Sequence, residues 1–385
     1  MLRKAVIVLG MHRSGTSLTA GILNKLGFDL GRAIMGANWA NSSGFFENFR
    51  ILEFNENLFQ KLQVNWHNTL GIVDNWWTDE NIQVEKKTLK DLIISDYIID
   101  GSLLFKDPRI CVLLPIYLEV LKELEINIFF ILTFRNPKEV AESLLTRDSF
   151  GLVKSHQLWM DHMLKAEMYS RGYPRLFIEY NSILNDPSFI IHQIFKKFSF
   201  KLSLSFEKKK EIFQFVEPTM NHFKSALIKT NDYPLDSYQL YQLFKKLEHR
   251  DAFLSEQNDF DELFKNFYSS FARKLIPKVT VITVTKSFSK DLERTIRSVT
   301  SQDYPDLEYI LVSCNSDNET KAIIEKNRYL LSQLIVESEV DDNKLRSKIM
   351  VISAGKLVIF MSPGTTFAYS NSINTMIKHI SVSEI

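Results

Sequence analysis

The chain has 385 residues, of which 45% are hydrophobic and 24% charged, with 47 Lys and Arg residues against 46 Asp and Glu residues. This length predicts two or three domains, and the composition is that of an ordinary soluble globular protein. The near balance of charge argues against broad binding to nucleic acids or anionic membranes, although it permits a local basic pocket.

The cysteines and the apolar runs of the sequence indicate which cellular compartment to expect. Cys111 and Cys314 are far apart in the sequence, without metal-ligand spacing, so we expect neither a disulfide framework nor a zinc site. The N-terminal run AVIVL is too short for a secretory signal, and INIFFILTF at 126–134 is well short of the ~20 residues that span a bilayer. We therefore expect a soluble, cytoplasmic protein with no membrane span.

The first element in the chain is a buried strand over 4–9, a short β-branched apolar run. The glycine-containing stretch GMHRSGTSLTAG (10–21) follows, and apolar residues then recur at helical spacing as far as Gly27, which suits a helix C-cap. Strand, glycine loop and helix in this order are the context that a phosphate-binding loop requires.

Alternating strand and helix patterns continue to about residue 180 and predict an α/β domain, with a parallel sheet covered by helices on both faces. The expected strands are 102–106, 127–134 and 175–180, and the expected helices are 47–62, 110–124, 137–147 and 155–171.

Residues 205–275 change character, because they are rich in Phe, Lys, Glu and Gln and show no persistent strand pattern. A strand pattern begins again at IPKVTVITVTKSFS, which indicates a second, small α/β unit. We therefore predict a first domain over 1–230, a helical connector over 231–276 and a second unit over 277–385.

The glycine loop has the outline G-x-x-x-x-G-K-[ST], but Thr16 stands where the lysine belongs. Gly10 and Gly15 allow successive N–H groups to point inward, and the helix that follows adds its positive N-terminal dipole. Thr16 and Ser17 can donate hydroxyl hydrogen bonds, and Arg13 supplies the cation. This pattern predicts binding of one terminal phosphate or phosphosulfate without a nucleoside triphosphate–Mg²⁺ complex. The alternative is a strand–helix turn that binds nothing.

A second anion anchor is expected where strand 127–134 ends, in TFRNPKEVAESLLTRD. Arg135 leaves the strand, Pro137 suits the first turn of a helix, and Ser143 lies eight residues after Arg135. An arginine at this sheet edge and a hydroxyl on the next helix can clamp a second phosphate. The alternative is an arginine that pairs with a carboxylate at a helix cap.

Together the two anchors resemble, in order and spacing, those of the bacterial branch of the sulfotransferases that use 3′-phosphoadenosine 5′-phosphosulfate (PAPS). The resemblance covers roughly residues 1–230, and further segments agree with it: GFFEN at 44–48, FKDPRI at 105–110, LW at 158–159, FIEYNSILNDP at 177–187 and FVEPTMNHFKS at 215–225.

The resemblance implies that PAPS is the donor. Arg135 and Ser143 would hold its 3′-phosphate, and Tyr180 stands where the family's tyrosine lies near the adenine, although a tyrosine of the core is an equal reading. The residues implied for the 5′-phosphosulfate are those of the loop: His12, Arg13, Ser14, Gly15, Thr16 and Ser17.

The same resemblance identifies a catalytic cation and a missing base. Lys106 aligns with the lysine of the family's KTH motif, which stabilises the bridging oxygen, and Arg13 would also act on the transferring group. The catalytic histidine of KTH falls on Pro108, which can accept no proton. The base must therefore lie elsewhere in the chain.

Glu47 is our first choice for that base, because partial desolvation beside Phe45 and Phe46 would raise its pKa toward a useful value. The Golgi relatives that modify heparan sulfate and tyrosine likewise use a glutamate shortly after the phosphate loop. A helix N-terminal glutamate is the alternative reading. Asp107 is a second candidate base, unless it pairs with Arg109, and His12 is a third candidate, better suited to positioning.

Acceptor contacts are expected from 36–80, where aromatic residues and asparagines accumulate. Such residues suit a sugar or an aromatic alcohol, and they equally suit a lid over the site. The aromatic side chains concerned are Trp39, Trp66, Trp76 and Trp77, and His67 lies among them.

The segment 279–313 contains the turn SVTSQDYP at 298–305, of the pattern S-V-x-x-Q-x-Y-P. In this it resembles the first half of family 2 glycosyltransferases. Ser313 and Asn318 stand where that family usually has aspartates, and 362–364 (SPG) where its metal carboxylates belong. A diphosphate–metal complex would find no ligands there. We expect a truncated, inactive glycosyltransferase-like unit.

The sequence therefore predicts a sulfotransferase that moves a sulfuryl group from PAPS to a hydroxyl, with a carbohydrate as the favoured acceptor and no metal. The alternatives are a non-catalytic nucleotide-binding or scaffold protein and, less favoured, a small-molecule kinase. The acceptor's identity and the oligomeric state are left open.

Overall fold

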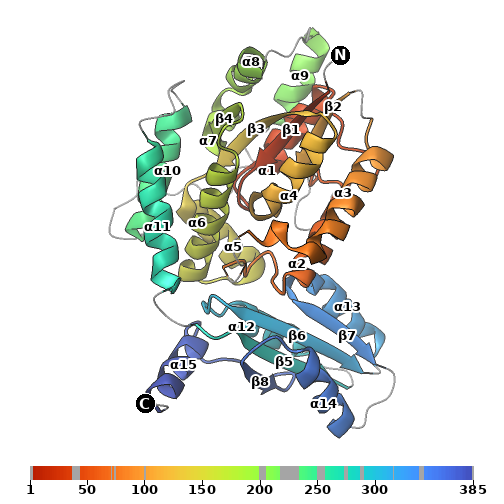
Figure 1. The fold of residues 1–385 in the computed structure, drawn as a ribbon, viewed down its shortest axis with the longest axis vertical. Helices are drawn as coiled ribbons and strands as arrows, with labels where there is room; N and C mark the ends of the chain where they lie inside the picture. Colours follow the sequence, from red (N-terminus) through yellow and green to blue (C-terminus); the bar gives the residue numbers. More distant parts are fainter. Residues whose placement is uncertain are drawn as a thin grey trace. The chain divides into compact units, whose positions relative to one another are not determined.

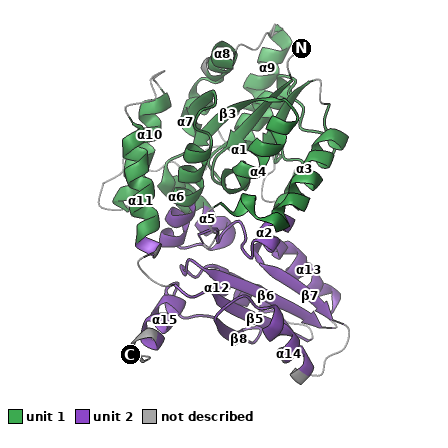
Figure 2. Ribbon diagram, viewed as in Figure 1, with its two compact units in different colours: residues 1–55, 74–143, 159–269 green, residues 56–73, 144–158, 270–385 purple. Residues whose placement is uncertain are grey.

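The computed structural model describes residues 3–36, 44–70, 72, 75–98, 101–198, 205–216, 234–248, 256–272, 276–286, 290–314, 316–337 and 342–383. The chain divides into two compact units (Figure 2). Unit 1 consists of residues 1–55, 74–143 and 159–269, and unit 2 of residues 56–73, 144–158 and 270–385. Each unit contains one four-stranded sheet (Figure 1).

The sheet of unit 1 is entirely parallel, with the strand order β2-β1-β3-β4. Its strands are β1 (Lys4–Leu9), β2 (Ser102–Lys106), β3 (Asn127–Phe134) and β4 (Arg175–Glu179). Because the strands are parallel, all four carboxyl ends meet at one edge of the sheet. The expected α/β class with a parallel sheet is confirmed.

The helices of this part of the chain follow the strands. They are α1 (Thr16–Lys25), α2 (Phe49–Lys61), α3 (Gln83–Asp96), α4 (Ile110–Glu123), α5 (Pro137–Asp148), α6 (Leu152–Tyr169), α7 (Tyr180–Asn185), α8 (Pro187–Phe198), α9 (Phe206–Phe215), α10 (Leu235–Glu248) and α11 (Gln257–Ala272), with short 3₁₀ turns at Trp76–Thr78 and Glu80–Ile82.

Helices cover both faces of the sheet of unit 1, as the alternation of β4 shows. Leu176 and Ile178 join a buried cluster with residues of α1, α8 and α9, whereas Phe177 points to the other face. There its ring stacks 5.7 Å from Phe244 of α10, which also contacts Phe260 of α11. This period of two buries β4 on both sides.

Unit 2 has its own parallel sheet in the order β7-β6-β5-β8. The strands are β5 (Val279–Thr285), β6 (Leu307–Cys314), β7 (Gln333–Glu337) and β8 (Leu357–Met361). The helices that follow them are α12 (Leu292–Thr300), α13 (Asn318–Lys326), α14 (Asp342–Ile352) and α15 (Ser372–Ser383), and a 3₁₀ turn spans Arg328–Leu330.

The compact units differ from the expected domain boundaries in two respects. The segment expected as a connector, 231–276, supplies α10 and α11 to unit 1, where α10 packs along β4. Segments 56–73 and 144–158, expected within the first domain, group with unit 2. Tertiary packing of apolar faces decides both points, and the local pattern of the sequence does not record it.

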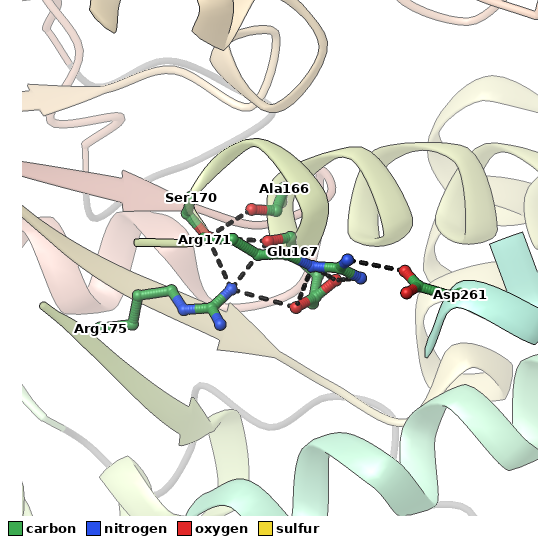
Figure 3. Close-up of polar contacts among 6 residues, drawn as sticks. All are labelled: Ala166, Glu167, Ser170, Arg171, Arg175 and Asp261. Carbon is green, nitrogen blue, oxygen red and sulfur yellow. Dashed lines mark hydrogen bonds and ion pairs between the residues drawn. The ribbon is translucent and has the colours of Figure 1, made fainter. Parts of the chain in front are cut away.

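An ion-pair cluster secures the amino-terminal end of β4 in unit 1 (Figure 3). Arg175 begins the strand and donates from Nη1 to the Glu167 carboxylate at 3.1 Å and to Ser170 Oγ at 3.3 Å. Arg171 also binds Glu167, and it reaches Asp261 of α11 at 2.6 Å. This cluster lies at the edge of the sheet opposite to its carboxyl ends, so we assign it to structure.

None of the helices in the described ranges combines the length and the apolar character needed to cross a lipid bilayer.

Candidate functional site at the carboxyl edge of the first sheet

The glycine loop connects β1 to α1 in a compact, strained turn. Arg13 has φ 70° and Gly15 has φ 95°, both in the left-handed region, and the Ser14 N–H donates to the Met11 carbonyl at 3.1 Å. A non-glycine residue holds that conformation only where the surroundings impose it. The Gly10 N–H donates to the buried Cys111 thiol of α4 at 3.1 Å, which fixes the start of the loop.

The N-terminus of α1 is open to an anion. Gly15 is its N-cap, no side chain caps it, and no acidic residue lies in its first turn. Within the described residues, the fully buried Ser14 hydroxyl has no hydrogen-bond partner. Unpaired first-turn N–H groups and a buried orphan hydroxyl are the features that a bound phosphate or sulfate oxygen satisfies.

Arg135 and Ser143 lie beside this loop. Arg13 Nε donates to Ser143 Oγ at 2.7 Å, so loop and helix α5 meet at the two residues expected to bind the donor. The Arg135 guanidinium pairs through Nε with Glu139 at 2.7 Å and approaches the Arg13 carbonyl at 3.5 Å. The pairing with a carboxylate considered for Arg135 is therefore present, together with the proximity to the phosphate loop.

Tyr180 joins the two anchors. Its ring lies under the Arg135 guanidinium, 4.5 Å from ring centroid to Cζ, and a Cβ added to Gly15 would come within 2.4 Å of its Cδ2 atom. Gly15 is thus required both by its backbone conformation and by the approach of this ring. Arg135 and Gly15 therefore both lie against one tyrosine ring at the carboxyl edge of the sheet of unit 1.

Lys106, at the end of β2, lies between the loop and the candidate base. Its Nζ donates to Ser17 Oγ at 3.0 Å and to the Phe45 carbonyl at 2.9 Å, and it forms a short ion pair with Glu47. Both side chains are buried. Burial raises the pKa of Glu47 above its ordinary value, and the adjacent Lys106 charge opposes that rise. The arrangement pairs a proton acceptor with a cation beside the loop.

Asp107, the alternative base, is engaged elsewhere. Its two carboxylate oxygens accept from Asn55 at 2.9 Å and from the Arg109 guanidinium at 2.9 Å, and the Arg109 N–H adds a third bond at 3.0 Å. These contacts favour the structural ion pair. His12, the third candidate, packs edge-on against His162 of α6, with 6.5 Å between ring centroids.

The aromatic residues expected at the acceptor pocket have other partners. In unit 2, Trp66 donates from its indole N–H to the Tyr329 carbonyl at 2.8 Å, and His67 Nε2 lies 3.0 Å from the Leu330 carbonyl. Burial lowers the pKa of His67 well below its usual range. Both side chains are packing residues of unit 2.

Two of the other tryptophans expected at the acceptor pocket also pack against aromatic side chains. Trp76 and Trp77 pack against each other, with 6.0 Å between ring centroids, and Trp77 packs against Tyr169. Trp39 and most of the motif at 215–225 lie outside the described residues.

At the carboxyl edge of the second sheet, polar side chains bond to one another or cap a helix. Glu337, which ends β7, pairs with Lys348. Ser313, near the end of β6, donates to Ser316 at 2.8 Å, and Asp317 caps α13 by accepting from the Thr320 N–H at 2.7 Å. Asn318 is the first residue of that helix. Across the described parts of the chain, no group of three or more His, Cys, Asp or Glu residues could hold a metal ion.

Two partners of the site were not singled out from the sequence. Glu139 holds Arg135, and Asn55 holds Asp107 while accepting from the Tyr117 hydroxyl at 2.7 Å. The spacing of four residues between Arg135 and Glu139 is a signal that could have found the first. No sequence pattern joins Asn55 to Asp107.

No family model matches the chain, and no curated protein matches it. Among solved structures, it is similar to the sulfotransferase domain from the Synechococcus PCC 7002 olefin synthase, with 15% identity, a TM-score of 0.31 and coverage of 71% of this chain and 95% of that one.

Two other solved structures match a smaller share of the chain. The mannosyltransferase PcManGT from Pyrobaculum calidifontis, in complex with GDP-Man and Mn²⁺, has 22% identity and a TM-score of 0.24 over 26% of this chain and 32% of its own. S. aureus TarS has 23% identity and a TM-score of 0.24 over 27% of this chain and 19% of its own. The chain thus spans a third or less of either protein. These scores assign no family, so the functional assignment depends on the site itself.

Proposed function

We propose that this protein transfers a sulfuryl group from PAPS to a hydroxyl group. The observation that carries the proposal is the continuity of the two anion anchors. Arg13 contacts Ser143, Arg135 lies over Tyr180, and Tyr180 packs against Gly15. One nucleotide with phosphate groups at both ends of its adenosine could engage this set.

The loop is suited to the 5′-phosphosulfate. The first-turn N–H groups of α1, the Ser14 hydroxyl and the Thr16 and Ser17 hydroxyls supply hydrogen-bond donors, and Arg13 supplies charge. Arg135 and Ser143 would bind the 3′-phosphate, the group that distinguishes PAPS from ATP. Tyr180 would pack beside the adenosine.

Glu47 and Lys106 have the chemistry that transfer requires. Glu47 would accept the proton of the acceptor hydroxyl as the oxygen forms its bond to sulfur. The bond between sulfur and the bridging oxygen breaks, and adenosine 3′,5′-bisphosphate leaves. Lys106, already within hydrogen-bond distance of Ser17, would stabilise the charge that develops on the bridging oxygen. A loose transition state makes positioning and charge the main contributions.

The raised pKa of Glu47 suits this role. A carboxylate with a pKa above its ordinary value is a stronger base, and the adjacent Lys106 charge favours its ionised form. A sugar hydroxyl is the acceptor that we favour, because the C-terminal segment resembles glycosyltransferases, which is an association between domains.

Incubation of the full chain with sulfur-labelled PAPS and a panel of saccharides and phenols tests the proposal. We expect labelled product and an equal amount of adenosine 3′,5′-bisphosphate with at least one acceptor, in the presence of EDTA, and product formation about 10²- to 10⁴-fold slower with Glu47→Gln. Transfer of phosphate from ATP–Mg²⁺ to the same panel, with none from PAPS, would contradict the proposal.

A further inference from the structure

Glu47 is held by a short segment between the loop that follows α1 and the start of α2. The Met35 N–H donates to the Glu47 carbonyl at 2.8 Å, and the Phe49 N–H donates to the Ala33 carbonyl at 2.7 Å. The residue before it, Phe46, has φ 51°, a strained conformation for an aromatic residue. The direction of the Glu47 side chain therefore depends on what anchors this segment.

Asn48 anchors the segment through both the nitrogen and the oxygen of its side-chain amide. Its amide nitrogen donates to the Leu30 carbonyl at 2.9 Å and to the Asp96 carboxylate at the end of α3. Its amide oxygen accepts from the N–H groups of Arg50, at 2.9 Å, and Ile51, at 3.2 Å, and so caps α2. Asn48 is 2% exposed, so its amide group is shielded from water.

The surroundings are shaped to receive this amide. Asp96 also accepts from the Arg32 N–H at 3.3 Å and lies 3.6 Å from the Arg50 guanidinium. Gly31 has φ 81°, and a Cβ added to it would come within 2.4 Å of Asn48 Nδ2 and 2.5 Å of Asp96 Oδ2. Only glycine allows the amide and the carboxylate to meet here.

We propose that Asn48 is a positioning residue for the base: it holds the backbone of Glu47 so that the carboxylate lies against Lys106. The inference rests on the proposed role of Glu47. Asn48 contacts neither the phosphate loop nor Lys106 in any hydrogen bond described above, so its effect passes through its neighbour. A reacting group displaced by about 1 Å can lose two orders of magnitude in rate.

Asn48→Ser separates the two functions of the side chain. Serine is as good an N-cap as asparagine, so α2 keeps its cap, but the amide donors to Leu30 and Asp96 are lost. We expect kcat for sulfuryl transfer to fall about 10- to 100-fold, while the Kd for adenosine 3′,5′-bisphosphate changes less than about twofold. Gly31→Ala should reproduce this split, because it pushes the same amide away.

A double-variant cycle gives a readout that a merely structural role would not move. In single-turnover measurements with Glu47→Gln as the background, we expect Asn48→Ser to have almost no additional effect, since the group that it positions is gone. An equal loss of rate in both backgrounds would overturn the proposal, as would equal weakening of bisphosphate binding. If Asn48→Ser does not fold, Gly31→Ala carries the same cycle.

Failure of this proposal is distinguishable from failure of the proposed function. A wild-type chain that transfers sulfate while Asn48→Ser and Gly31→Ala keep full kcat would remove only the positioning role. A wild-type chain that neither binds the bisphosphate nor uses PAPS would remove the function on which the role depends.

Discussion

The two parallel sheets share an architecture and differ at their carboxyl edges. In unit 1, the edge carries Lys106 after β2, Arg135 after β3 and an uncapped helix N-terminus after β1. In unit 2, the edge carries hydroxyl groups that bond to each other and an aspartate that is used as a helix cap. The same edge of a parallel sheet can therefore carry converging basic side chains, as in unit 1, or side chains that bond to one another, as in unit 2.

This difference teaches that fold alone does not locate chemistry. Ligands of open α/β sheets bind outside the carboxyl ends of the strands, but only where side chains of suitable charge converge. Buried ionisable groups converge in unit 1, where Glu47 and Lys106 are nearly inaccessible to water. Burial raises the pKa of Glu47, and a buried carboxyl group with a raised pKa beside a charged partner is typical of functional sites.

The largest effect is expected from Glu47→Gln, which tests whether the charged edge is catalytic. The amide keeps the size of the side chain but cannot accept the proton, so kcat should fall about 10²- to 10⁴-fold. Bisphosphate affinity should be unchanged by calorimetry, and Glu123→Gln, a change in an exposed ion pair with Lys90, is the control. Full activity of Glu47→Gln would show that the base is another group.

Lys106→Met sharpens the same comparison through pH. Removal of the cation should lower kcat about 10²- to 10³-fold, because the departing oxygen loses its stabilising charge. It should also raise the pKa of Glu47 further, since Lys106 opposes the effect of burial. The acidic limb of the kcat profile, where Glu47 becomes protonated, should therefore move to higher pH. Lys90→Met, a change in the exposed ion pair with Glu123, is the control. An acidic limb at the same pH in Lys106→Met as in wild type would show that a group other than Glu47 sets the profile.

Arg135→Ala tests the second anchor. Loss of a charge-assisted hydrogen bond to the 3′-phosphate should weaken bisphosphate binding about 10- to 100-fold. Arg171→Ala is the matched control, because it removes an arginine of the cluster at the opposite end of β4 (Figure 3). This control should lower thermal stability and retain affinity. Equal loss of affinity in both variants would point to general destabilisation.

The smallest effect is expected in unit 2 and concerns stability, because the buried Lys154 has no role in the proposed reaction. Lys154 donates to the Thr300 carbonyl at the end of α12, and burial lowers its pKa to about 7. The unfolded chain keeps this proton to about pH 10.4, so the free energy of unfolding should rise with pH between about 7 and 10. Lys154→Met should remove that dependence of the free energy of unfolding on pH, because no titratable group is left at the position. Amide hydrogen exchange of α12 measures both effects.

The strands of unit 1 and the residues at their carboxyl ends could be predicted from the sequence, because local patterns specify them. The expected strands 4–9, 102–106 and 127–134 coincide with β1, β2 and β3. Short apolar runs that end at a glycine or a charged residue identify both the strands and their carboxyl ends. Arg135 and Ser143 followed from the spacing on one strand and one helix, which the chain itself fixes.

The remaining features depend on contacts between distant segments. Trp66 bonds to the Tyr329 carbonyl and His67 to the Leu330 carbonyl. Asn48, just before α2, bonds to Asp96 at the end of α3. The sequence around an indole N–H or a side-chain amide does not predict which distant group it will bind. The aromatic residues at 36–80 therefore indicated an acceptor pocket, whereas packing placed Trp66 and His67 in unit 2.

The most direct test of the central claim is calorimetric titration of the full chain with adenosine 3′,5′-bisphosphate in EDTA, beside a titration with ATP–Mg²⁺. Two adjacent anion anchors predict metal-free binding of the bisphosphate, tighter than that of ATP–Mg²⁺. Preference for ATP–Mg²⁺ would indicate a kinase, and binding of neither nucleotide would indicate a non-catalytic protein. Either result would contradict the assignment of this edge to PAPS.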